Sequence, residues 1–434
     1  MQRADAITGY SLLALVIFAL LASLGLPALA LVAGFFAWVA AVRLFPRLAW
    51  LQKIQVAVML AMGSAGLLWG QWHSTDVSWW LQAWEANQAL LSMLISVSFL
   101  RLVAISDLAA REALPTGRQA LWKTLFGVHA FGAVINFSAM IIMGDRLHSR
   151  KPLSPLQALI ISRGFTLAAH WSPFFAAMGV VLVSAPGADL LTLMAVGSVV
   201  AALGLFLAGW WLLQSPEAEA TQAYPMHWQA LALPLTLAIS VLLAHSLWEE
   251  LPILTLVSLL SLLFTLVLLF LRYQKKGFKR LRQHIEHTLP TMSGETLLFL
   301  AAGVLAAGLG AFMQAVDFSL QVNHFGPWQA WFLLVALVAL SGVGVHPVIS
   351  IATAGGIFAP SVEDPNLLAL VFLMTWSLGV AFSPLSGTQL AMQGRYGLPA
   401  HAFTRWNFGF VLMMLVVHLL ALHTYVFLTS DRFL

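Results

Sequence analysis

The chain has 434 residues, of which 60% are hydrophobic and only 9% are charged, whereas an ordinary soluble domain has roughly a quarter charged residues. This composition excludes a soluble globular fold, and the absence of cysteine excludes disulfides, thiolate metal sites and cysteine chemistry. The formal charge of +4 gives no reason to expect nucleic-acid binding, because most cationic residues fall in a few short loops.

Apolar runs of about 20 residues recur along the whole chain, and each is long enough to cross a bilayer as a helix. The first run resembles a signal peptide, but apolar sequence continues beyond it, so we expect a first membrane span. The apolar windows predict eleven spans, at 8–24, 27–43, 53–70, 87–105, 156–184, 190–213, 228–246, 251–272, 294–315, 366–392 and 406–428. Two further apolar segments, 124–143 and 329–360, carry Gly, Asn, Ser, His or Pro near their middles and suit single helices poorly.

Positively charged loops orient these spans, because Lys and Arg favour the cytoplasmic side. Eleven alternating spans, with the N-terminus inside and the C-terminus outside, place three basic loops in the cytoplasm. These loops contain Arg43, Arg47 and Lys53; Arg111, Arg118 and Lys123; and Arg272, Lys275, Lys276, Lys279, Arg280 and Arg282. The segment 124–143 has basic flanks, including Arg146, Arg150 and Lys151, whereas 329–360 has acidic flanks and no Lys or Arg beside it. We therefore predict two re-entrant hairpins that open to opposite sides.

Opposed hairpins suggest an inverted repeat, and two pairs of motifs support it. Gly127-Val128-His129-Ala130 in the first hairpin matches Gly344-Val345-His346-Pro347 in the second, and each hairpin is followed by a span with an internal Ser-Pro pair. The predicted organisation is N-terminal scaffold spans in 1–52, a first half in 53–280 and a second half in 281–434. The first half contains the hairpin 124–143 and the broken helix 156–184; the second contains the hairpin 329–360 and the broken helix 366–392.

The two Ser-Pro pairs, Ser172-Pro173 and Ser383-Pro384, are predicted to unwind their helices, because proline removes a backbone hydrogen bond and clashes with the preceding turn. Unwound backbone inside a membrane faces protein or water. Transporters with inverted repeats bind substrates and coupling ions at such breaks. Hydroxyl groups beside the breaks, including those of Ser386 and Thr388, are therefore candidate ligands, although back-bonding to helix carbonyls is the alternative.

Other polar residues at membrane depth admit two interpretations each. His129 and His346 either bond to backbone carbonyls within the hairpins or handle substrate or protons. Arg163, which shares its span with His170, is either the counter-charge of an anionic substrate or snorkels to the lipid headgroups. Glu295 is either an N-terminal cap carboxylate or an ion-coupling group.

This pattern of opposed hairpins and broken spans resembles the ion transporter superfamily, which includes divalent anion/sodium symporters, citrate permeases and arsenite permeases. The resemblance covers nearly the whole chain and includes Leu114-Pro115-Thr116-Gly117-Arg118 before the first hairpin and Ser383-Pro384-Leu385-Ser386-Gly387-Thr388 in the second broken span. The family's Ser-Asn-Thr triplet is absent, and Asn136-Phe137-Ser138 and Ser350 to Thr353 are the nearest equivalents. The candidate substrate- and ion-binding residues are His129, Asn136, Ser138, Arg163, His170, Ser172, Pro173, His346, Ser350, Thr353, Ser383, Pro384, Ser386, Gly387 and Thr388.

The resemblance implies an all-α carrier of the bacterial inner membrane that moves a small anion, coupled to sodium or protons, by an elevator-like movement. It also implies a homodimer in contact with membrane lipids, with no resident cofactor and with the helix breaks as candidate sodium sites. No Walker phosphate loop, GxxxxGK[ST], occurs in the sequence. A sodium/proton antiporter that uses His129, His346 and Glu295 is the main alternative, and a membrane enzyme acting on lipid-linked substrates is a second.

Overall fold

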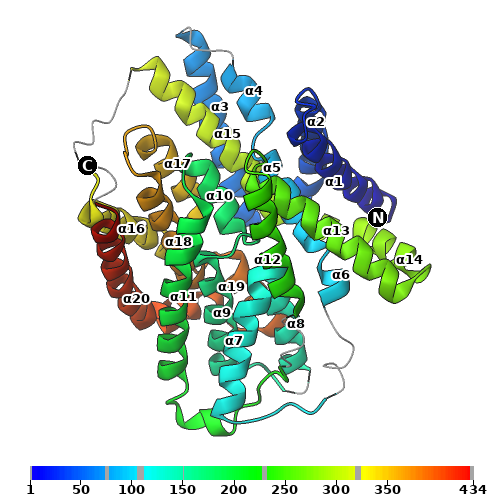
Figure 1. The fold of residues 1–434 in the computed structure, drawn as a ribbon, viewed down its shortest axis with the longest axis vertical. Coiled ribbons are helices and arrows are strands. Elements are labelled where there is room, and N and C mark those ends of the chain that lie inside the picture. The colour runs from blue at the N-terminus through cyan, green and yellow to red at the C-terminus, as the bar shows by residue number, and fades with distance from the viewer. Residues whose placement is uncertain are drawn as a thin grey trace. The chain divides into compact units, whose positions relative to one another are not determined.

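The computed structural model describes residues 2–73, 78–104, 112–149, 151–226, 232–317 and 324–430. These residues form helices without named strands, apart from an isolated bridge between Thr116 and Gln222 (Figure 1). Nine helices in the described ranges are long and apolar enough to cross a membrane, so the chain is an integral membrane protein with many spans. Arg111 and Arg150, which were used to orient the spans, lie outside the described residues.

Two of the eleven predicted spans are absent from these nine helices. The segment 156–184 is divided into α9 (Pro155–Leu167), the short η2 (Ala168–His170) and α10 (Ala176–Ser184). The segment 228–246 gives α12 (Ala232–Leu247), whose apolar part, Leu235–Leu247, is shorter than the other spans. The remaining nine predicted spans each overlap a long apolar helix.

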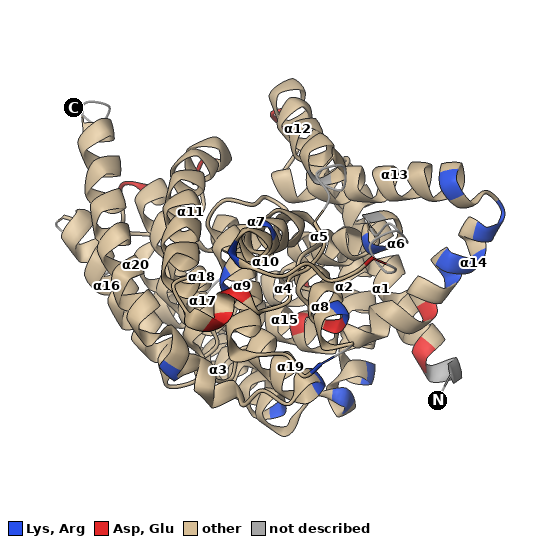
Figure 2. Ribbon diagram, turned by 90° about the horizontal axis from the view of Figure 1, so that it is seen from below, with Lys and Arg blue, Asp and Glu red and all other residues tan. Residues whose placement is uncertain are grey.

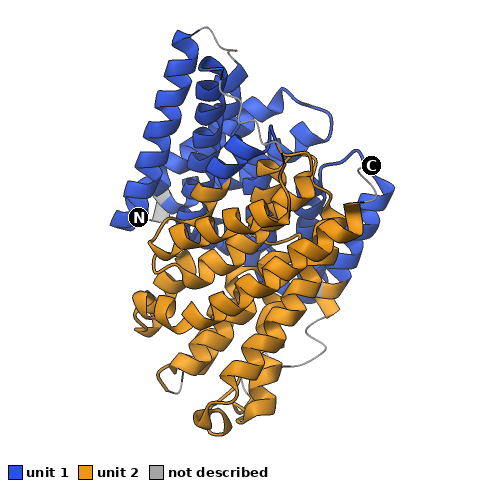
Figure 3. Cartoon of the chain, turned by 90° about the vertical axis from the view of Figure 1, so that its left-hand side faces the viewer, with its two compact units in different colours: residues 1–104, 236–321, 352–361 blue, residues 105–235, 322–351, 362–434 orange. Residues whose placement is uncertain are grey.

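The chain forms two compact units whose segments alternate along the sequence (Figure 3). Unit 1 contains Met1–Ala104, Thr236–Gln321 and Ala352–Ser361, and unit 2 contains Ile105–Leu235, Val322–Ile351 and Val362–Leu434. Packing therefore groups the elements differently from the predicted repeat halves, which follow sequence order. Each unit contains elements of both halves.

Unit 1 is built around two long helices that approach each other closely. A Cβ atom at Gly66 of α3 would overlap the carbonyl of Gly308 in α15, and one at Gly308 would overlap the carbonyl of Gly63. Glycine at these positions lets the two backbones touch, as small residues do in membrane helix pairs. The helices of unit 1 are α1 (Gln2–Ser23), α2 (Leu29–Leu44), η1 (Phe45–Arg47), α3 (Trp50–Trp72), α4 (Ser78–Trp84), α5 (Gln88–Ser98), α6 (Arg101–Ala104), most of α12, α13 (Ile253–Tyr273), α14 (Lys276–Gln283), η5 (His284–Thr288), η6 (Leu289–Thr291), α15 (Ser293–Ala315) and the later part of α17 (Pro347–Phe358).

The basic segment after α13 folds into the short helix α14, along which Lys and Arg are concentrated (Figure 2). Arg280 lies 3.7 Å from the ring centroid of Tyr273, and Arg282 forms an ion pair with Glu286 at 2.8 Å.

The next residue after α14, His284, is 3% exposed and lies against the ring of Phe99, with its Nε2 3.1 Å from the Ser98 hydroxyl. Burial, together with the positive charge of Arg101, lowers the pKa of His284 to about 4.

Unit 2 contains four helix interruptions. They fall at Asn136, Trp171–Phe175, Val343–His346 and Ser383–Ser386, so both Ser-Pro pairs lie where the sequence predicted breaks. The helices are α7 (Arg118–Ile135), α8 (Phe137–His148), α9, η2, α10, α11 (Leu190–Leu212), η3 (Pro216–Glu219), α16 (Pro327–Gly342), the start of α17 (Pro347–Phe358), α18 (Pro365–Phe382), α19 (Gly387–Tyr396) and α20 (Ala400–Thr429). The predicted hairpin 124–143 falls within α7 and α8, and 329–360 corresponds to α16 and α17.

The close α3–α15 pair makes Gly308 sensitive to a single methyl group. We expect Gly308→Ala to destabilise the detergent-purified protein by about 1–3 kcal/mol, because the added Cβ overpacks a backbone contact. The matched control is Gly394→Ala in α19, where a Cβ meets nothing within 4 Å and a helix gains up to about 1 kcal/mol from alanine. Thermal unfolding midpoints measure both, and equal midpoints for the two variants would refute the close approach.

Because His284 is buried in its neutral form, we expect the free energy of unfolding to fall at acidic pH. Between pH 6.5 and about 4 the unfolded chain binds a proton at this position and the folded chain does not. The free energy of unfolding therefore falls as the pH falls, by up to about 1.4 kcal/mol per pH unit. We expect His284→Gln to reduce the difference between the unfolding midpoints at pH 7 and pH 5.5. The exposed neighbour His287 is the control, because His287→Gln should keep the wild-type difference.

Candidate functional site

All of the predicted site residues except Thr353 belong to unit 2. Thr353 lies in the later part of α17, which belongs to unit 1, whereas Ser350 near the start of the same helix belongs to unit 2. Ser350 is buried and donates to the Pro347 carbonyl at 3.0 Å, and Ser138 near the start of α8 is partly exposed. The remaining residues gather around the four interruptions.

The interruption between α9 and α10 is tied to the turn between α7 and α8. The Ser172 hydroxyl donates to the Ala133 carbonyl and accepts from the Phe174 amide at 3.2 Å. Asn136, which has a positive φ of 51°, donates from its side chain to the Phe174 carbonyl at 2.7 Å. Ser172 and Asn136 thus provide hydrogen-bond partners for backbone that the break at Pro173 frees from helix.

His129 in α7 also contacts the interruption between α9 and α10. The Trp171 indole donates to His129 Nε2 at 3.0 Å, so this nitrogen is unprotonated, and His129 Nδ1 lies 3.2 Å from the Gly164 carbonyl. A carbonyl only accepts hydrogen bonds, so the proton resides on Nδ1 and the ring is neutral. Both ring nitrogens of His129 therefore have protein partners, which favours the backbone-bonded interpretation of this histidine.

A similar joint forms between the α16–α17 turn and the break after α18. Gly344 has a φ of 105°, and Cβ atoms built at Gly342 and Gly344 would meet the side chains of Phe382 and Leu385. The ring of His346 accepts from the Val348 amide through Nδ1 at 3.2 Å and lies edge-on to Trp376. The Ser383 hydroxyl accepts from the Leu385 amide at 3.3 Å, as the Ser172 hydroxyl accepts from Phe174.

The start of α19 beyond this break is open. Ser386 caps the helix by accepting from the Gln389 amide at 3.4 Å, and its hydroxyl lies 3.0 Å from that of Thr388. Gly387 is exposed, and a Cβ atom there would meet nothing within 4 Å. The first amides of a helix lack intrahelical acceptors and carry a partial positive charge. This end of α19 therefore offers hydroxyl and amide donors to an anion.

Arg163 in α9 is a buried cation without an acidic partner in the described parts of the chain. It is 1% exposed, which excludes the snorkelling interpretation. Its Nε donates to Asn407 Oδ1 at 2.9 Å, its Nη2 donates to the Trp406 carbonyl at 3.1 Å, and its Cζ lies 4.4 Å from the centroid of the Phe410 ring. The third nitrogen, Nη1, is buried and has no hydrogen-bond partner among the described residues.

Two further polar side chains join α9 and α20 to the second break. The Gln389 amide donates to the Ser162 hydroxyl at 3.3 Å and to the Ala381 carbonyl at 3.1 Å, and the Asn407 amide donates to the same carbonyl at 2.8 Å. These bonds satisfy a carbonyl at the end of α18. Neither Gln389 nor Asn407 was among the predicted site residues, although an amide side chain within an apolar span was a detectable signal.

A third link across unit 2 joins two histidines. His170 Nε2 lies 3.0 Å from Nε2 of His418 in α20, and both residues are at most 1% exposed. His418 was missed from sequence because it pairs with a residue 248 positions away. The described residues contain no cluster of three or more acidic or histidine side chains able to hold a metal ion.

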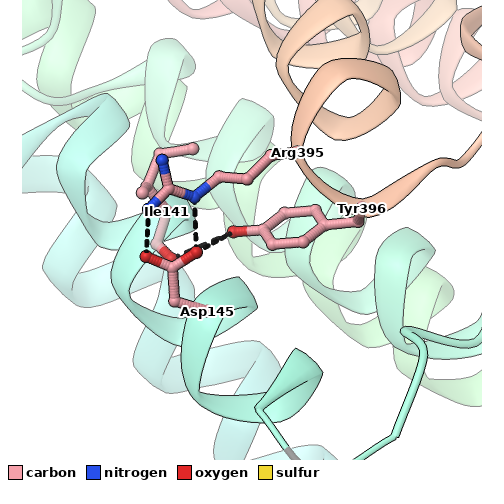
Figure 4. A network of polar contacts seen from close by, with 4 residues as sticks. All are labelled: Ile141, Asp145, Arg395 and Tyr396. Atoms are coloured by element: carbon pink, nitrogen blue, oxygen red, sulfur yellow. Dashed lines mark hydrogen bonds and ion pairs between the residues drawn. The ribbon is translucent and has the colours of Figure 1, made fainter.

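An ion pair connects α8 to the end of α19 (Figure 4). Asp145 Oδ2 accepts from Arg395 Nη2 at 2.6 Å, and Asp145 Oδ1 accepts from the Tyr396 hydroxyl at 3.1 Å. The Tyr396 hydroxyl also lies 3.1 Å from the Ile141 carbonyl. Arg395, which follows the second break, is thus neutralised by a carboxylate from the first helix pair, in contrast to Arg163.

No protein-family model matches the sequence. No curated protein matches it either. The resemblance to the ion transporter superfamily therefore rests on this chain's own sequence motifs.

Proposed function

We propose that this chain is a secondary active transporter of the ion transporter superfamily that carries a small carboxylate-type anion across the bacterial inner membrane. The observation that carries the proposal is the construction of unit 2. Two helices interrupted at Ser-Pro pairs are each tied to the turn of a neighbouring helix pair. Interrupted helices of this kind form binding sites in transporters built from inverted repeats.

The anion preference follows from the charges and donors of unit 2. Arg163 is fully buried and has no carboxylate partner among the described residues, and the α19 start presents its first amides beside the hydroxyls of Ser386 and Thr388. A buried charge without a counter-ion is costly, so this environment favours a negatively charged ligand. We place the anion at the α19 start, with Arg163 supplying positive potential from within the unit.

The helix pairs α7–α8 and α16–α17 are, in this proposal, the two opposed re-entrant hairpins. Unit 2, together with the later part of α17, then corresponds to the hairpin-bearing transport domain, and the rest of unit 1 corresponds to the scaffold, which in related architectures also forms a homodimer. The N-terminus lies inside and the C-terminus outside, and a sodium or proton gradient drives transport. The chain acts as a carrier without a resident cofactor and not as an enzyme.

The open space at Gly387 gives a direct test of the anion position. Gly387→Val introduces a side chain that meets little protein but covers the first amides of α19. We expect it to raise the KM for gradient-driven uptake by about tenfold or more, which corresponds to about 1.4 kcal/mol of lost binding. Proteoliposomes given imposed sodium or proton gradients are screened with labelled dicarboxylates, citrate, monocarboxylates and arsenite.

Gly394→Val is the matched control, because a Cβ atom at Gly394 in the same helix also meets nothing within 4 Å. It should transport with the wild-type KM. An unchanged KM for Gly387→Val would remove the anion from the α19 start. If no anion moves but an internal pH dye reports sodium-dependent proton flux, the antiporter interpretation replaces the proposal.

Arg163 predicts a second effect on transport. We expect Arg163→Gln to reduce anion uptake by 10-fold to 100-fold, in the range for loss of a charged interaction, because neutral glutamine removes the uncompensated positive charge of unit 2. Arg163→Lys keeps the charge but loses the planar contacts to Asn407 and the Trp406 carbonyl, so it should retain more uptake than Arg163→Gln. Equal losses in both variants, with wild-type unfolding midpoints, would contradict the role of charge.

A further inference from the structure

The His170–His418 pair of unit 2 has one free lone pair that can accept an additional proton. The two Nε2 atoms are 3.0 Å apart, and His170 Nδ1 lies 3.0 Å from the Leu167 carbonyl. The carbonyl only accepts, so His170 carries its proton on Nδ1 and, when neutral, accepts through Nε2. His418 must then donate from its own Nε2, which leaves its Nδ1 as a bare lone pair.

His418 Nδ1 is buried and has no hydrogen-bond partner among the described residues. An added proton at this atom converts the pair into one imidazole and one imidazolium that still share the Nε2 hydrogen bond. A second added proton would remove that bond and place two like charges 3 Å apart. The pair therefore alternates between neutral and singly protonated states.

The helices around the pair carry no acidic residue to balance an imidazolium. The helices α7, α9, α10, α11, α16, α18, α19 and α20 contain no Asp or Glu. The titratable and cationic groups on them are Arg118, Lys123 and His129 of α7, Arg163 of α9, Arg395 and Tyr396 of α19, and His401, Arg405, His418, His423 and Tyr425 of α20. Tyr425 contacts Asp364, the carboxylate that caps the start of α18. Protonation of the pair thus adds positive charge to a region that already holds Arg163.

An anion bound in unit 2 offsets this positive charge. Its negative charge stabilises the imidazolium, and by thermodynamic linkage the imidazolium strengthens anion binding by the same free energy. His170 also ends η2 directly before the interruption at Trp171, so the proton would be held beside the first helix break of unit 2. We propose that the His170–His418 pair binds a proton that is cotransported with the anion, an inference that rests on the proposed transport function.

Proton binding is measured directly on the purified protein. Weakly buffered detergent solutions of wild type, His418→Phe and His170→Asn are titrated from pH 8 to pH 5 without substrate and then with succinate or citrate. We expect each variant to take up about one proton fewer than wild type over the whole titration with succinate or citrate present. We also expect the proton uptake that accompanies anion addition to disappear in both variants.

His423→Phe is the control, because His423 lies on the same helix, contacts Trp328 and takes no part in the pair. It should keep the proton uptake that accompanies anion binding. His418→Gln provides a second test if His418→Phe unfolds. Anion-linked proton uptake that persists in folded variants of both His170 and His418 overturns the inference, even if transport is intact.

The transport assay separates this inference from the proposed function. In the His418 variants, a proton gradient should no longer drive uptake, whereas anion exchange at equal pH on both sides should continue. If sodium alone drives uptake in wild type, the anion carrier stands and the proton role of the pair is refuted. If wild type neither binds nor moves any of the anions, the proposed function fails, and the cotransport role of the pair fails with it.

Discussion

The structure of unit 2 depends on the hydrogen bonding of backbone released by helix breaks. Inside a membrane no water is available to an unpaired carbonyl or amide, so a break is stable only where protein supplies partners. At the first break, Ser172 and Asn136 supply them through the Ala133 and Phe174 backbone. At the second, Gln389 and Asn407 both donate to the Ala381 carbonyl. Each break thus requires side chains from elements distant in sequence.

Because the breaks need hydrogen-bond partners from other elements, α9 and η2 link the first part of unit 2 to α19 and α20. Three polar residues on α9 and η2 contact helices near the C-terminal end of the chain. Ser162 contacts Gln389, Arg163 contacts Asn407, and His170 contacts His418. Breakage of any one of these contacts would leave a polar group unpaired in a buried setting, which costs about 1–3 kcal/mol. The two broken helices are therefore joined by side-chain hydrogen bonds.

The sequence predicted the break positions because proline acts locally, whatever lies around it. It also predicted that the segments 124–143 and 329–360 are not single helices, since their central Gly, Asn and His residues disagree with an ordinary apolar span, and each segment is interrupted in the structure. The partners of these elements were not predictable in the same way. Asn407 and His418 are visible as polar residues in a mainly apolar span, but their partners Arg163 and His170 are more than 240 residues away. The division of the chain into alternating segments of units 1 and 2 likewise follows from packing, and the local amino-acid composition does not predict it.

The contrast between Arg163 and Arg395 gives the best physical account of what unit 2 accommodates. Arg395 is half exposed and is neutralised by Asp145, so it stabilises the fold locally. Arg163 is buried against Phe410 with neutral acceptors only, and one of its nitrogens has no described partner. A purely structural cation in this position would gain from a carboxylate, and the surrounding helices contain none. An uncompensated buried charge in a unit with two broken helices is the arrangement expected where a mobile anion supplies the missing negative charge during each transport cycle.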